Sequence, residues 1–235
     1  MARLKEYNGH YCESEYEYAF IGFLEAEGWK YTSGNKLSRV TKRDVLIEDD
    51  FKKFIADGNL DLTEDEVTQI YDTVRLVGAE SDFATLHKVY NWLVDGIQFT
   101  PKDGIARMIP LINFEKDGVK NIFRVVNQFT VEYTNNGQKE NRRPDVILFV
   151  NGMPLCIMEL KNPADANATI YDAWEQINIR YWRDIPHLLH YCPLACISDG
   201  VKTRLGTVRT PYEHFYAWRR VNDGDAVFCN RRYRK

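Results

Sequence analysis

The feature that most constrains the fold is a pair of apolar runs joined by Asn-Gly, in the stretch RRPDVILFVNGMPLCIMELKNP at residues 142–163. Both runs, 146–150 and 155–158, are continuously apolar. Such runs predict strands that are covered on both faces, because a strand with one wetted face alternates apolar and polar residues. We therefore expect a hairpin inside a layered sheet.

Three charged residues lie at the ends of these apolar runs: Asp145, Glu159 and Lys161. A buried carboxylate costs on the order of several kcal/mol unless it is paired or bound to a metal. One lysine cannot neutralise two acids, so a further cation is expected. Two carboxylates and a main-chain carbonyl, such as that of Leu160, are the oxygen ligands that Mg²⁺ prefers.

The register of the hairpin decides whether the two acids meet. A two-residue Asn-Gly turn with regular pairing places Asp145 opposite Met158 and on the other face of the sheet from Glu159. A three-residue loop over 151–153 pairs Asp145 with Glu159, and a β-bulge has the same effect. The sequence therefore predicts an odd loop or a bulge.

The remaining pattern predicts an α/β fold, a mixed β-sheet flanked by helices with an additional helical subdomain. Apolar periodicity and capping residues predict helices at 14–28, 44–57, 63–74, 82–95, 165–183 and 212–221. Strands are expected over 121–134, in the hairpin and over 193–198, with turns at 135–137 and 198–200 and an irregular segment at 96–118. We expect one domain over 1–235, with a sheet core at 121–200 and a helical insertion at 44–95.

The composition predicts a globular protein of a reducing compartment of the cell. The 235 residues, 44% apolar, suffice for one large core. No run of 18 apolar residues and no signal-peptide pattern is present, so we expect a cytoplasmic protein without membrane contact. The five cysteines form no CxxC pair, which favours reduced thiols, and Cys156 is expected in the core.

Charge is distributed unevenly along the chain although its net value is only −3. Residues 44–82 hold twelve acidic and three basic residues, whereas residues 200–235 hold nine basic and three acidic ones. This distribution predicts two oppositely charged surfaces, one of which suits phosphate contact. Two ordinary solvated patches are the alternative.

A second group of metal-binding residue types lies at His187, His190, Cys192 and Cys196. Its spacing matches neither a paired CxxC site nor a zinc finger, so we expect core and surface positions there.

The hairpin also carries a family resemblance. Pro144-Asp145 followed by Glu159-Leu160-Lys161 resembles the PD-(D/E)xK nuclease motif. Together with the segments SEYEYAFIGFLEAEGW and LACISDGVKTRLGT, it is similar to the N-terminal domain of type I restriction enzyme R subunits, over about residues 10–220. The resemblance implies a restriction-endonuclease-like core that hydrolyses phosphodiester bonds of double-stranded DNA with Mg²⁺, for which Mn²⁺ would substitute.

The same resemblance assigns roles to individual residues. Asp145 and Glu159 would hold the metal with the Leu160 carbonyl and a carboxylate from the first helix, for which Glu17 has the matching position. Lys161 would orient the attacking water or stabilise phosphate charge. Helical spacing places Glu17 on the apolar stripe of its helix, whereas Glu15 points about 160° away. The alternative is that Glu17 is only the N3 acid of a capping box at Ser14. A salt bridge at the sheet end is the alternative for the other three side chains.

The family's Q-x-x-x-Y element is altered here. Gln176 is followed four residues later by Arg180, with Tyr181 one position further. In an α-helix Gln176 and Arg180 share a face, so Arg180 would contact phosphate in place of the tyrosine, or the two form a solvated pair and the element is absent. Arg142 and Arg143 are further candidates for DNA contacts.

The resemblance implies a longer polypeptide with ATP-driven helicase domains, acting with methylation (M) and specificity (S) subunits. No GxxxxGK[ST] loop is present, so we expect ATP to bind only the full-length subunit. Two alternatives stay open: a stand-alone repair nuclease of the same superfamily, and a non-cleaving docking module with a degenerate site.

Overall fold

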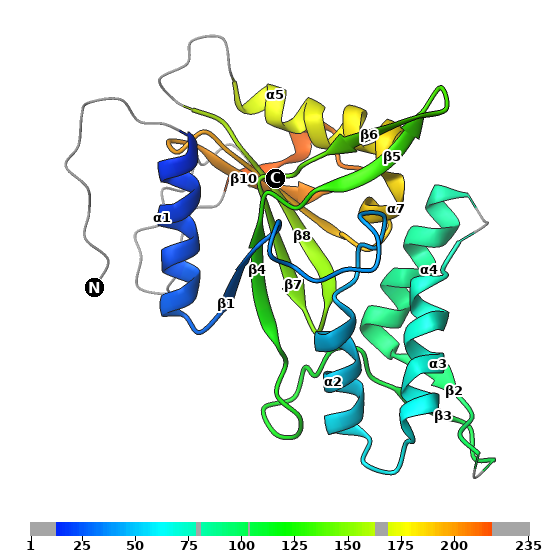
Figure 1. Ribbon diagram of the computed structural model, residues 1–235. Coiled ribbons are helices and arrows are strands. Elements are labelled where there is room, and N and C mark those ends of the chain that lie inside the picture. Colours follow the sequence, from blue (N-terminus) through cyan, green and yellow to red (C-terminus); the bar gives the residue numbers. More distant parts are fainter. Residues whose placement is uncertain (1–12, 79–80, 103, 163–168, 218–235) are drawn as a thin grey trace, which may run out of the picture.

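A mixed seven-stranded sheet forms the centre of the protein (Figure 1). The computed structural model describes residues 13–78, 81–102, 104–162 and 169–217. The order is β1 (Lys30–Ser33), β4 (Phe123–Asn127), β7 (Val146–Val150), β8 (Met153–Leu160), β9 (Leu194–Ser198), β10 (Thr203–Thr207) and β11 (Tyr216–Ala217). The β1–β4 and β8–β9 pairs are parallel and the other pairs antiparallel. The predicted α/β class with a mixed sheet is confirmed.

Helices flank this sheet on both sides (Figure 1). They are α1 (Glu13–Ala26), α2 (Glu48–Gly58), α3 (Glu64–Arg75), α4 (Asp82–Asp95), α5 (Ile170–Glu175), the π-helical turn η1 (Gln176–Tyr181), α6 (Trp182–Asp184), α7 (Pro186–Leu189) and the 3₁₀ turn η2 (Tyr212–His214). The first four helices confirm the predicted ones, and α3 has the expected capping box at Thr63 and Glu66. The prediction of a helix at 212–221 is wrong for residues 212–217, which form η2 and β11. The rest of that predicted helix lies outside the described residues.

The single strand predicted over 121–134 is two strands, β4 and β5, and the sequence pattern missed several other short strands. Two separate hairpins are formed by β2 (Ile97–Phe99) with β3 (Arg107–Ile109), and by β5 (Val131–Asn135) with β6 (Gln138–Arg142). The first lies in the segment expected to be irregular. The second makes the predicted turn, with Asn136 and Gly137 at positive φ. Strand β6, QKENR, has no apolar alternation because it is exposed or half-buried throughout, so only its pairing identifies it.

Strand alternation explains the continuous apolar runs of the hairpin. Val146 and Met158 point to the α1 face, where they pack with Ile21. Ile147 and Ile157 point to the opposite face and join the larger core that includes α2 to α5. Figure 1 shows α1 beside β1 and β4, with α2 to α4 on the other side. Both faces of the central strands are therefore covered, as predicted.

The helical segment is joined to the sheet through the hairpin turn. Asn151 and Gly152 have φ values of 51° and 77°, and the backbone N–H of Ile47 donates to the Gly152 carbonyl at 2.8 Å. A Cβ on Gly152 would lie 2.2 Å from the Ile47 carbonyl oxygen. Only glycine allows α2 to approach the turn this closely. The boundaries predicted for a helical subdomain at 44–95 stay a prediction.

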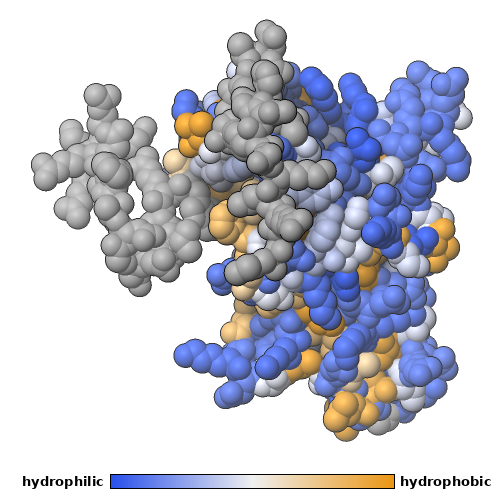
Figure 2. All heavy atoms as spheres, turned by 60° about the vertical axis from the view of Figure 1, so that its left-hand side comes forward, coloured by the Kyte–Doolittle hydropathy of each residue, from blue (hydrophilic) through white to orange (hydrophobic). Residues whose placement is uncertain are grey.

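The outer surface is largely polar on the face seen in Figure 2, where apolar side chains occur in small groups among hydrophilic ones. No helix in the described ranges has the length and apolar character needed to cross a bilayer.

Candidate active site

A β-bulge brings the two hairpin acids together. Val150 pairs with Met153 across a two-residue turn, so the three-residue loop is wrong. The register then shifts between Leu148 and Phe149, because Leu155 is an extra residue on β8. Beyond the shift Val146 pairs with Met158, and continuing this register by one residue places Asp145 opposite Glu159. The predicted bulge is confirmed, with the effect on the two acids that the sequence required.

Glu159 lies in the interior at the end of β8, with an exposed fraction of 0%. Its Oε1 accepts from Tyr181 Oη at 2.6 Å, and its Oε2 accepts from Gln176 Nε2 at 2.7 Å. Burial raises the pKa of Glu159 well above its ordinary value, and the adjacent charge of Asp145 raises it further. Two carboxyl groups that share a low-dielectric site cannot both ionise freely.

The π-helical turn η1 corrects our interpretation of the Q-x-x-x-Y element. In a π turn the residue spacing widens to five, so Gln176 faces Tyr181 and not Arg180. Gln176 Nε2 lies 2.8 Å from Tyr181 Oη. Arg180 is exposed, and its guanidinium lies 3.7 Å from Glu175. Tyr181 is buried as the core stripe predicted, but its hydroxyl also reaches the site, so the one-residue insertion preserves the element.

Lys161 and Asp145 complete this arrangement. Lys161 Nζ donates to Gln176 Oε1 at 3.1 Å and lies 3.9 Å from Glu159 Oε2. Asp145 is half-buried, and its Oδ2 accepts from the backbone N–H of Leu160 at 2.9 Å. We refer to Asp145, Glu159, Lys161, Gln176 and Tyr181 as the carboxylate site.

Glu17 approaches the sheet from α1 and is 3% exposed. Its two oxygens accept hydrogen bonds from Asn127 and Gln128, at the end of β4. Glu15 is exposed, so the predicted orientation of the helix is confirmed. Ser14 lies within the described helix, so Ser14 is not its N-cap and the capping role for Glu17 is wrong.

The sequence reasoning missed Asn127 and Gln128. The available signal was a polar pair directly after the β-branched stretch of β4, at the point where that strand ends. Polar residues at a strand end are also common in turns, so the signal was weak.

The carboxylate site has the donor set of a divalent-cation site. Asp145 and Glu159 provide hard oxygen ligands, and a cation would offset the burial and the repulsion from Asp145 that raise the pKa of Glu159. In the part of the chain that the structure describes, no group of three or more His, Cys, Asp or Glu residues is placed to hold one ion. The Leu160 carbonyl and water would therefore fill further positions, and Glu17 as an acidic ligand stays a prediction.

The two arginines before the hairpin differ in their surroundings. Arg142 Nε donates to Asp184 Oδ2 at 2.6 Å, and its guanidinium lies over the ring of Tyr133. Arg142 therefore ties β6 to α6. Arg143 is exposed. DNA contacts by Arg142, Arg143, Gln176 and Arg180 stay predictions, and for Gln176 the structure adds the role of joining Lys161 to Glu159.

The histidines and cysteines at 187–196 occupy the expected core and surface positions. Cys192 and Cys196 are buried, and His190 Nε2 lies 2.9 Å from Asp82 Oδ1. Cys156 is likewise in the core.

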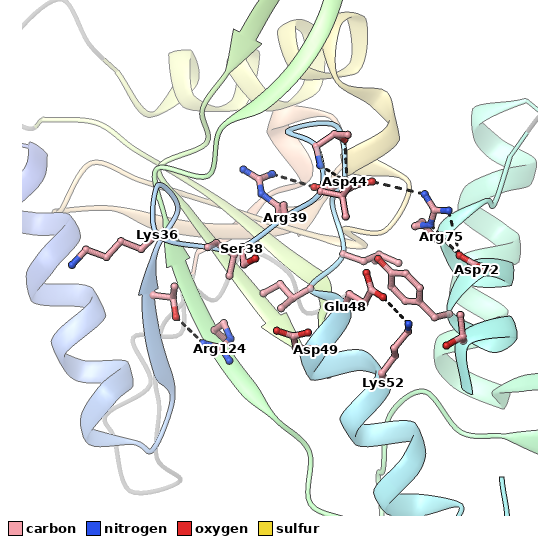
Figure 3. Close-up of a pocket in the computed structure, with 18 residues that line it drawn as sticks. Lys36, Ser38, Arg39, Asp44, Glu48, Asp49, Lys52, Asp72, Arg75 and Arg124 are labelled. Carbon is pink, nitrogen blue, oxygen red and sulfur yellow. Dashed lines mark hydrogen bonds and ion pairs between the residues drawn. The ribbon is translucent and has the colours of Figure 1, made fainter. Parts of the chain in front are cut away.

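A cavity of about 560 Å³ lies between the 36–49 loop, α2, α3 and β4 (Figure 3). Both basic and acidic side chains line it. Figure 3 shows Lys52 directed at Glu48, 2.6 Å away, and Arg75 directed at Asp72, 3.2 Å away. No member of the carboxylate site lines this cavity. Because its cations are largely neutralised by their neighbours, we assign it no chemical role.

Comparison with known proteins establishes the family. The family described as type I restriction enzyme R protein N terminus matches residues 11–214. The chain belongs to this family. The matched range contains Glu17 and every residue of the carboxylate site.

Relatives of this R-protein N-terminal domain carry names of the same kind. The chain is 34% identical over 221 residues to the MjaIXP endonuclease subunit of Methanocaldococcus jannaschii, and 30% identical over 225 residues to the HindI endonuclease subunit of Haemophilus influenzae. Both are named as type I restriction enzyme subunits, and each match covers 90% of this chain. The chain spans 21% and 20% of the lengths of these relatives.

Proposed function

We propose that this domain is a Mg²⁺-dependent endonuclease that hydrolyses DNA phosphodiester bonds in a type I restriction system. The observation that carries the proposal is the bulge in β8, which faces Asp145 toward Glu159 beside Lys161. A fully buried acid beside a second carboxyl group is costly without a compensating cation. We further propose that the sheet is a restriction-endonuclease-like core.

The side chains of the site suit this reaction. Mg²⁺, or Mn²⁺ in its place, held by Asp145, Glu159 and the Leu160 carbonyl, would supply Lewis-acid polarisation of the scissile phosphate. Tyr181 and Gln176 fix the orientation of Glu159 by donating to its two oxygens. Gln176 also holds the ammonium of Lys161, which has further N–H donors for a water molecule or a phosphate oxygen.

Toward Glu159, the hydroxyl of Tyr181 can act only as a hydrogen-bond donor. Burial and the neighbouring Glu159 raise the pKa of Tyr181 far above its ordinary value, so its phenol stays protonated. A protonated phenol 2.6 Å from Glu159 Oε1 favours the ionised form of that carboxyl, which is the form that binds a cation.

The wider assignment is part of the same proposal, and the names of the relatives as type I restriction enzyme endonuclease subunits support it. Double-stranded DNA as substrate, methylation and specificity subunits as partners, and ATP-driven helicase domains in a longer polypeptide are part of this proposal. ATP would act on those domains and not on this one. A cytoplasmic location also stays a prediction.

Metal titration tests the proposal. We expect isothermal calorimetry to detect Mn²⁺ and Mg²⁺ binding to the chain, and Asp145→Asn to weaken it at least about tenfold. Glu15→Gln is the matched control, because Glu15 is an exposed acid two residues from Glu17. Absence of binding, or equal binding by Asp145→Asn, would support a non-cleaving docking module instead. Among the described residues, no third acid is placed with Asp145 and Glu159 to hold one ion, which is the observation that favours this rival.

A cleavage assay separates the second alternative. Mg²⁺-dependent cutting of plasmid DNA by this chain alone, without ATP or partner subunits, would favour a stand-alone repair nuclease. Cutting that requires a longer polypeptide and ATP would favour the restriction subunit.

A further inference from the structure

Asn127, the last residue of β4, and Gln128 enclose the carboxylate of Glu17. Asn127 Nδ2 donates to Glu17 Oε1 at 2.5 Å, and Gln128 Nε2 donates to Glu17 Oε2 at 2.8 Å. The amide oxygen of Asn127 accepts from Tyr31 Oη at 3.1 Å, which leaves its nitrogen facing the acid. Each oxygen of Glu17 is therefore satisfied by a neutral amide.

The two amide donors are neutral, so they do not compensate the negative charge of a Glu17 carboxylate. Glu17 is 3% exposed, and no Lys, Arg or His within the described ranges forms an ion pair with it. Buried acids with a purely structural role are usually paired with a cation. Amide donors occupy one lone pair on each oxygen and add no positive charge, so further lone pairs can still face a cation.

Gln128 connects Glu17 to Asp145, because its side chain contacts the first acid and its backbone contacts the second. Its N–H donates to the Asp145 carbonyl at 2.8 Å, and its φ is 51°, a left-handed value that is uncommon outside glycine. Gly34 packs against the turn so closely that a Cβ there would lie 2.6 Å from the Gln128 carbonyl oxygen. Glycine at 128 would adopt this backbone with less strain, so the backbone conformation by itself does not call for glutamine.

We propose that Asn127 and Gln128 are positioning residues that hold the Glu17 carboxylate in the orientation that binds a divalent cation. Gln128 also fixes this carboxylate relative to the backbone of Asp145. The inference rests on the function proposed above and adds two neutral residues to it. Through Gln128, the side chain of one acid and the backbone of the other belong to one hydrogen-bonded unit.

Gln128→Gly tests the proposal, because it removes the amide and relaxes the backbone together. We expect the Mn²⁺ dissociation constant to rise about tenfold, while the relaxed backbone offsets part of the stability lost with the buried hydrogen bond, so that the thermal unfolding midpoint changes little. Asn136→Gly is the matched control, because Asn136 also has a positive φ, 48°, and lies at an exposed hairpin turn. This variant should bind Mn²⁺ with the affinity of the unaltered chain. A lower midpoint for Gln128→Gly with unchanged Mn²⁺ affinity would show that the amides only tie α1 to the sheet, and would overturn the proposal.

A double-mutant cycle shows whether Gln128 acts through Glu17. We expect Glu17→Gln to weaken Mn²⁺ binding, and the Glu17→Gln, Gln128→Gly double variant to bind no more weakly than Glu17→Gln alone. Fold-changes that multiply in the double variant would mean that the two residues act independently, which contradicts the proposal.

The same titrations separate the two levels of inference. Loss of binding in Asp145→Asn with normal binding in Glu17→Gln and Gln128→Gly would preserve the nuclease site and reject the role of the amides. Equal binding by Asp145→Asn and the unaltered chain would reject the nuclease site itself.

Discussion

Replacing Glu159 by glutamine should stabilise the metal-free protein at neutral pH. Glu159 is fully buried, and its pKa lies well above the ordinary 4.5, through burial first and the charge of Asp145 second. A folded state that holds a proton more tightly than the unfolded state loses stability as pH rises between the two pKa values. The contribution is complete below pH 4.5 and is lost as pH rises through the folded pKa.

The magnitude follows from the width of that window. One proton changes the free energy of unfolding by about 1.4 kcal/mol for each pH unit. Between pH 4.5 and 7 a single group can therefore cost at most about 3.5 kcal/mol. Glutamine has the same shape, keeps an acceptor for Gln176 and offers a donor toward Tyr181 or Asp145. We expect Glu159→Gln to gain about 1 to 3 kcal/mol at pH 7 and almost nothing at pH 4.

Urea unfolding from pH 4 to 8, in a chelator, measures this difference. Subtracting the two stability curves removes the titration of all groups except Glu159 and its coupled neighbour Asp145. Mn²⁺ should then raise the stability of the unaltered protein and leave Glu159→Gln nearly unchanged. The reasoning fails if Glu159→Gln is the less stable protein at pH 7, or if the difference between the curves does not vary with pH.

Three further substitutions test the structure. Tyr181→Phe leaves a buried carboxylate oxygen without a donor and should cost about 1 to 3 kcal/mol in urea unfolding, against about 0.5 to 1.5 for Tyr16→Phe, whose hydroxyl meets only Ser198 Oγ. Thr63→Ala removes the capping box of α3 and should cost about 1 kcal/mol in thermal unfolding. Gly152→Ala meets a carbonyl oxygen at 2.2 Å and should cost more than about 2 kcal/mol by calorimetry, whereas Gly137→Ala, also at positive φ but with open space, should cost about 1. Equal effects within either matched pair would contradict these contacts.

The sequence alone determined which residues could form the site. The continuous apolar runs required strands covered on both faces, and the cost of burying Asp145 and Glu159 required a register that brings them together. These two arguments predicted an odd loop or a bulge, because regular pairing would have placed the acids on opposite faces, and the structure has the bulge. The helices α1 to α4 were also predictable, since their apolar periodicity and caps are local signals.

Only the tertiary structure decided how the site is held. The sequence placed Gln176 and Arg180 on one face because it assumed α-helical spacing, whereas packing at Tyr181 and its bond to Glu159 accompany a π turn. The amides at Asn127 and Gln128 reach Glu17 across more than a hundred residues of chain, so no local pattern could pair them. Local sequence patterns identify the helices, the strands and the candidate acids. Contacts between distant segments determine which side chains orient those acids.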